Sequence, residues 1–165
     1  MGAATRSFIP PDQASLHQAI DAVCAEGAWM STPCFEPTPA WNHALDTPAC
    51  ARHQLLVVFD KDQVVGWCRL FPAPDCPGLD SQAEVGIGLL PDYRGRGLGQ
   101  ALLTQALGWA AGNRFEQVTL TTRADNARAI RLFERCGFTI QNHRIDSWLD
   151  MACHLPSPGG YPNER

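Results

Sequence analysis

Arg94-Gly95-Arg96-Gly97-Leu98-Gly99 is the stretch that decides the fold of this 165-residue chain. It lies between two apolar runs: Ala83–Leu90 has the character of a β-strand, and Ala101–Ala111 that of a helix. Glycine allows backbone conformations closed to other residues, and the unpaired N–H groups at the start of a helix attract an anion. A strand, a glycine–arginine turn and a helix therefore predict a cradle for a diphosphate group, with Arg94 and Arg96 as additional cationic donors.

The rest of the chain alternates between helix-like and strand-like segments. We expect a short strand at Phe8, helices at Asp12–Ala25 and Ala40–Leu45, strands at Gln54–Phe59, Val64–Phe71 and Gln117–Thr122, a helix capped by Asp125 or Asn126 and ending at Gly137, and strands at Phe138–Ile145 and Trp148–Leu155. Asp12 is the expected N-cap of the first helix, and Pro72–Ser81 is an expected loop. This order predicts one mixed α/β domain over residues 1–155, followed by a loose tail over residues 156–165.

Composition and charge exclude several classes of protein. The chain is 45% hydrophobic and 18% charged, which is typical of a globular domain. It contains neither an apolar run of the roughly 20 residues that span a membrane nor a secretion signal, so we expect a cytoplasmic protein. The net charge of −4 argues against nucleic-acid binding. From Val85 onward nine bases face seven acids, which suits an anionic ligand in the C-terminal half.

The seven cysteines form no C-x-x-C pair, and their odd number and scattered spacing argue against both a disulfide framework and a structural zinc site. The five histidines lack the H-x-x-x-H spacing of metal ligands. We therefore expect free thiols and no metal.

A second motif follows the first about thirty residues later: Asn126, an apolar helix, and Gly137-Phe138. Together the two motifs resemble those of the GNAT superfamily of acyl-CoA-dependent N-acetyltransferases, whose phosphate-binding signature is [Q/R]-x-x-G-x-[G/A]. The order of elements is similar to the family's from about Phe8 to Leu155. The resemblance implies a mixed, mostly antiparallel sheet of about seven strands flanked by about four helices, with acetyl-CoA as acyl-donor cosubstrate.

The resemblance also implies which residues bind acetyl-CoA. The strand before the signature would pair with the pantetheine arm, and the N–H groups of the glycine loop would bind the diphosphate. Asn126 would reach the pantetheine or the acceptor side, cap its helix, or do both. Gly86 and Gly88 either mark a bulge that opens the sheet or relieve crowding. The implied cofactor-binding residues are Ile87, Gly88, Leu89, Arg94, Gly95, Arg96, Gly97, Leu98, Gly99, Gln100, Asn126 and Phe133.

Glu84 matches a position where many family members carry their general base. An ammonium group cannot attack a thioester, so a base must take its proton, directly or through a water. A backbone N–H near Leu89 would hold the developing oxyanion. Glu84 could instead be an edge-facing charge or the partner of an arginine. Phe133 stands where the family often has Tyr, which excludes a tyrosine acid there.

The acceptor is expected to be a primary amine of a small molecule or a peptide. In this fold it usually lies against the first helices, their loop and the last strand pair. The candidate residues are Glu26, Trp29, Phe35, Glu36, Trp41 and Trp148, although a Trp under a long loop, such as Trp29 or Trp41, is more often a core residue than a ligand contact. The family's habits leave a homodimer open. A second reading of the chain is an acyl-CoA-binding sensor or interaction module with weak or lost catalysis.

Overall fold

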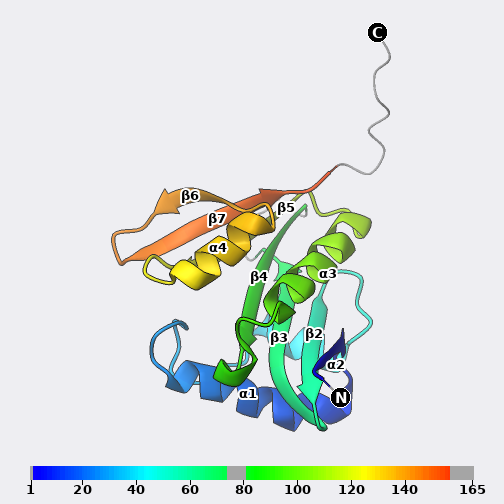
Figure 1. Cartoon of the computed structure of the whole chain (residues 1–165). Helices are drawn as coiled ribbons and strands as arrows, with labels where there is room; N and C mark the ends of the chain where they lie inside the picture. The colour runs from blue at the N-terminus through cyan, green and yellow to red at the C-terminus, as the bar shows by residue number, and fades with distance from the viewer. Residues whose placement is uncertain (1, 74–80, 157–165) are drawn as a thin grey trace.

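The computed structural model describes residues 2–73 and 81–156 as one sheet covered by helices (Figure 1). Its strands lie in the order β1-β2-β3-β4-β5-β7-β6. Their bounds are β1 (Ala4–Ser7), β2 (Gln54–Asp60), β3 (Gln63–Pro72), β4 (Gln82–Leu89), β5 (Gln117–Arg123), β6 (Thr139–His143) and β7 (Trp148–His154). All neighbours are antiparallel except β4 and β5.

Helices pack on both faces of this sheet. The helices are α1 (Gln13–Ala25), α2 (Pro39–Asp46), α3 (Leu98–Gly112) and α4 (Ala127–Arg135), with short 3-10 turns at Pro10–Asp12 and Pro91–Tyr93. Residues of α3 and α4 share one buried cluster with the sheet, and residues of α1 and α2 share another. In Figure 1, α3 and α4 lie in front of the strands. The sheet is thus the middle of three layers, as the mixed α/β prediction requires.

Two details at the N-terminus differ from the sequence-based prediction. The first strand is Ala4–Ser7, and Phe8 follows it as a buried residue that is 2% exposed. Asp12 precedes α1, but its carboxylate makes no capping bond there. It accepts two bonds from Arg6, at 2.6 and 2.8 Å, and one from the N–H of Ile9 at 3.0 Å. The charge-assisted pair with Arg6 has displaced the cap.

Two predicted segments fall wholly or largely outside the described residues. They are most of the Pro72–Ser81 loop and the tail from Pro156.

Candidate functional site

The loop between β4 and α3 adopts the backbone that its glycines permit. Gly95 and Gly97 have φ angles of +73° and +80°, and a side chain added at either would point into open space. Among the residues that the structure describes, the backbone N–H groups from Gly95 to Gln100 donate to no acceptor. Six unpaired donors at and just before a helix N-terminus can bind an anion, such as the diphosphate that the sequence predicts here.

Arg94 fixes this loop to its surroundings. Its Nε donates to the carbonyl oxygen of Leu89 at 2.9 Å, and its Nη1 donates to Oε1 of Glu26 at 2.9 Å. The second guanidinium nitrogen bonds the other carboxylate oxygen, so the pair is bidentate. Arg96 is exposed, and its guanidinium lies 5.3 Å from the Tyr93 ring centre. Arg94 therefore positions the loop, whereas Arg96 keeps its donors at the surface.

Gly99 has a packing role. A Cβ on Gly99 would lie 2.9 Å from Cδ2 of Leu132. Because Leu132 belongs to α4, glycine here lets α3 and α4 approach closely. This contact joins the two motifs that carry the family resemblance.

The strands β4 and β5 separate beside the loop. Their parallel ladder pairs Gln82–Glu84 with Gln117–Thr119 and ends there. β4 continues to Leu89 with β3 on its other side. The far half of β4 thus has an edge without a strand on it in the described part of the chain.

The backbone groups on this edge belong to Ile87 and Leu89. The N–H of Leu90 donates to Val65 on β3 at 2.9 Å, and successive residues of a strand point their groups to opposite sides. The N–H and C=O groups of Ile87 and the N–H of Leu89 therefore face away from β3, toward the gap. Those of Gly88 face β3. An extended ligand arm can pair with Ile87 and Leu89 as a further strand would.

Gly86 and Gly88 form no bulge, because the β3–β4 register runs without a shift. A Cβ on Gly86 would lie 2.8 Å from Nε of Arg69, and one on Gly88 would lie 2.3 Å from the Trp67 ring. Of the two interpretations of these glycines, relief of crowding is the one that the structure supports. The opening arises instead from the early end of the β4–β5 ladder.

Glu84 is partly exposed on the face of the sheet that carries Arg69. One of its carboxylate oxygens accepts a 2.9 Å bond from Nη2 of Arg69. The sequence predicted Glu84 as a candidate base or an arginine partner, and it missed Arg69 as that partner. A hairpin of β3 with β4 would have placed the two residues diagonally across from each other.

The second motif lies at the start of α4. The side chain of Asn126 caps the helix by accepting a 3.2 Å bond from the N–H of Ala129. Phe133 is buried in the core, with its ring centre 5.9 Å from that of Phe138. Phe133 therefore has no polar group and little surface to offer a cofactor, because it is only 5% exposed.

The candidate acceptor residues lie on different elements of the fold. Trp41 is 9% exposed and packs edge-on against Phe35 and Phe71, so it is a core residue. Trp148 lies on β7 with the Arg123 guanidinium 5.6 Å from its ring. Trp29 is partly exposed in the loop after α1, and Glu26 is held by Arg94. Phe35, in the same loop, stacks on His17 of α1 with the ring centres 4.4 Å apart, so its ring packs against that helix.

The six cysteines in the described part are free thiols, as predicted: Cys24, Cys34, Cys50, Cys68, Cys136 and Cys153. The helices of that part are all too short or too polar to cross a membrane.

Comparison with curated proteins finds several relatives that are named mycothiol acetyltransferases. A mycothiol acetyltransferase of Geodermatophilus obscurus is 36% identical over 96 residues, which cover 56% of this chain and 30% of the relative. One from Corynebacterium glutamicum is 31% identical over 134 residues, covering 79% of this chain and 41% of the relative. The chain thus spans well under half the length of these relatives.

Solved structures share the fold. An acetyltransferase of the GNAT family from Streptococcus pneumoniae superposes with a TM-score of 0.81 at 19% identity, covering 94% of this chain and all of that one. A GNAT superfamily phosphinothricin acetyltransferase from Sinorhizobium meliloti, solved with acetyl-CoA, gives 0.78 at 22% identity and covers 99% and 97%.

The family profile described as Acetyltransferase (GNAT) family matches residues 21–138, from α1 through the loop to Gly137-Phe138. This match and the shared fold confirm both the family and the fold class predicted from the sequence. The chain belongs to the acetyltransferase (GNAT) family.

Proposed function

We propose that this chain transfers an acetyl group from acetyl-CoA to the primary amine of a small molecule. The observation that carries the proposal is the row of unpaired N–H groups from Gly95 to Gln100, beside the open edge of β4. The donors suit a diphosphate, and the edge suits a pantetheine arm. Acetyl-CoA supplies the acyl group as an activated thioester.

The residues of β4 would carry the transfer. Glu84 would take a proton from the acceptor ammonium, and a bridging water extends its reach along the strand. The Arg69 guanidinium, whose Nη2 lies 2.9 Å from one carboxylate oxygen of Glu84, holds this side chain in place. The N–H of Leu89, which faces the gap beside β4, would stabilise the negative charge that develops on the carbonyl oxygen. With Phe133 buried, solvent would protonate the departing thiolate, which is a weak base.

A small-molecule acceptor is favoured by the names of the curated relatives, which are mycothiol acetyltransferases. We assign three side chains to the acceptor region. Trp148 and Arg123 lie together on the neighbouring strands β7 and β5, and Trp29 follows Glu26 by three residues in the loop after α1. A peptide amine is the alternative acceptor.

The test is thiol release from acetyl-CoA across a panel of amines that includes the non-acetylated precursor of mycothiol, polyamines, amino acids and short peptides, with products identified by mass. We expect acetylated product from at least one small amine, above the rate without protein. Saturable acetyl-CoA binding with no turnover on any amine would favour the sensor reading instead. Failure to bind acetyl-CoA would overturn both.

A further inference from the structure

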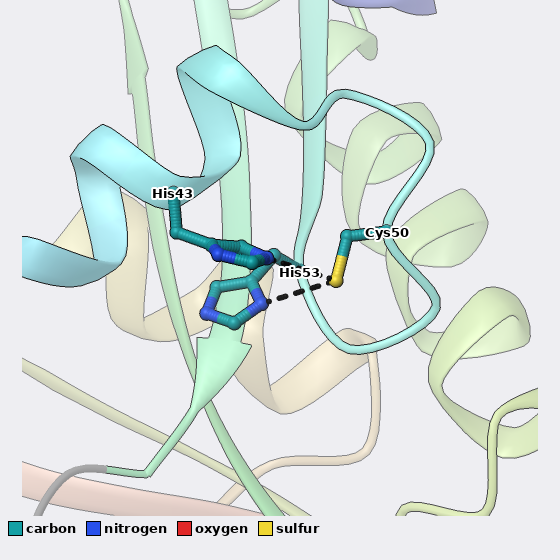
Figure 2. A group of neighbouring side chains, drawn as sticks. All are labelled: His43, Cys50 and His53. Carbon is teal, nitrogen blue, oxygen red and sulfur yellow. Dashed lines mark hydrogen bonds between the residues drawn. The ribbon is translucent and has the colours of Figure 1, made fainter.

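His43, Cys50 and His53 form a side-chain cluster far from the glycine loop in sequence (Figure 2). His43 lies in the last turns of α2, Cys50 in the connection that follows, and His53 directly before β2. Figure 2 shows both imidazole rings turned toward the Cys50 sulfur. The ring centres of the two histidines are 4.3 Å apart.

The distances within this cluster match those of a metal site. Nε2 of His43 lies 3.2 Å from Sγ of Cys50, and Nδ1 of His53 lies 3.5 Å from it. Zinc binds sulfur at about 2.3 Å and imidazole nitrogen at about 2.0–2.1 Å, so a tetrahedral site holds sulfur and nitrogen about 3.6 Å apart. The three ligand atoms all lie within 4.8 Å of one another. A metal can enter with small side-chain movements.

The surroundings supply a second set of contacts. The backbone N–H of Arg52 donates to Sγ of Cys50 at 3.4 Å, a bond that stabilises a thiolate ligand. The Arg52 guanidinium donates to the carbonyl oxygen of Asn113 at 3.3 Å and lies over the Phe115 ring, 4.0 Å from its centre.

A cavity of about 340 Å³ adjoins the cluster and is lined in part by Cys50, His53, Trp109 and Asn113. It gives solvent access to the sulfur and to one imidazole. A site with three protein ligands keeps its fourth position for water or another small ligand. The cavity has room for that fourth ligand.

We propose that His43, Cys50 and His53 bind a divalent transition metal, Zn²⁺ in the first place, with a fourth position open to this cavity. One thiolate and two imidazoles form a ligand set that binds zinc in preference to magnesium or calcium. This proposal departs from the expectation of no metal, which considered the spacing of the cysteines and that of the histidines separately. The informative pattern is His43-x6-Cys50-x2-His53, in which ligands of both types alternate. Metal binding would tie the end of α2 to the connection that follows it and to the start of β2.

Cobalt titration of the chelator-treated full chain tests the site directly. One equivalent of Co²⁺ should give a sulfur-to-cobalt charge-transfer band and the intense visible bands of a tetrahedral ion, and Zn²⁺ should displace it. Cys34→Ser and His154→Gln, which change exposed residues outside the cluster, should keep both signals. Cys50→Ser should abolish the charge-transfer band, and His43→Gln or His53→Gln should weaken binding at least tenfold. A wild type without the band, or a Cys50→Ser protein that keeps it, overturns the proposal.

Alkylation of the wild-type protein gives an answer that needs no variant to fold. Zn²⁺ should slow the alkylation of Cys50 by iodoacetamide at least tenfold and leave that of Cys34 unchanged, as read by peptide mass. Equal rates at Cys50 with and without Zn²⁺ overturn the site. Neither readout depends on acetyl transfer, so the site and the proposed enzyme activity fail or stand separately.

Discussion

At the residue scale, the account of catalysis depends on what Glu84 does beyond pairing with Arg69. Both the base and the ion-pair interpretation of this residue agree with its position. The two interpretations predict different effects of substitution. A neutral residue at either Glu84 or Arg69 breaks the ion pair, whereas only a substitution of Glu84 removes the base.

We expect Glu84→Gln to lower kcat by about a hundredfold or more and to flatten its rise with pH, with acetyl-CoA affinity nearly unchanged. Arg69→Gln breaks the same ion pair and keeps the carboxylate, so its loss should be much smaller. Steady-state kinetics against pH measure both, with the exposed Glu116→Gln as control. If Arg69→Gln and Glu84→Gln lose equal activity and share one pH profile, Glu84 is a structural partner.

Burial gives a second prediction at this scale. Complete burial raises the pKa of the Cys68 thiol to about 12. Because the thiolate is the reactive form, alkylation of Cys68 at pH 8 should be about a thousandfold slower than that of the exposed Cys34. Peptide mass spectrometry at timed intervals measures both rates, and denaturant should make them equal. Comparable rates in the native protein would show that the β3 core opens readily.

At the scale of single elements, the loop before α3 is the critical one, and Gly97 tests it. Gly97→Val should remove thermal stabilisation by acetyl-CoA, because a β-branched residue disfavours the φ of +80° that this loop needs to direct its N–H groups at one ligand. Gly27→Val is a matched control, since Gly27 also has a positive φ (+67°) and open space around it. It should lose stability without losing the ligand shift. A Gly97→Val protein still stabilised by acetyl-CoA would place the diphosphate elsewhere.

The link between β1 and α1 yields a prediction on pH. The Arg6 guanidinium lowers the pKa of Asp12 in the folded state. The pair therefore stabilises the fold above the unfolded pKa, near 3.9, and this contribution is lost as the pH falls through the folded value. Asp12→Asn should cost about 1 kcal/mol of unfolding free energy at pH 7, and the difference should shrink below pH 4. Urea unfolding measures it, and a pH-independent difference would contradict the ion pair.

Most elements were predictable because their periodicity and termini agree. The observed bounds lie within a residue or two of those expected for strands Gln54–Asp60 and Gln63–Pro72 and for the end of helix Leu98–Gly112, because apolar runs bounded by turn residues leave few alternatives. That helix begins three residues earlier than expected. The sequence did not reveal that Asp12 leaves its expected capping position to bind Arg6, because Arg6 belongs to another element. The local sequence therefore predicts bonds within an element well and bonds between elements poorly.

At the scale of the whole molecule, the site was predicted in its glycine loop and missed in its cross-strand contacts. The N–H donors at Gly95–Gln100 were predictable from a single continuous motif, the glycine–arginine turn between a strand and a helix. Arg69 beside Glu84, and Trp67 beneath Gly88, depend on the register of β3 with β4. The cluster of His43, Cys50 and His53 depends on how α2 returns to β2. Each of these needs the assembled sheet.

The central claim is that the cradle between β4 and α3 binds acetyl-CoA through its backbone amides. Titration of ¹⁵N-labelled protein with acetyl-CoA, followed by amide NMR, tests it most directly. The account predicts the largest shifts at Gly95 through Gln100, with further shifts at Ile87 and Leu89 and little change at β1 or β6. Binding that leaves the Gly95–Gln100 amides unmoved while other residues shift would contradict it.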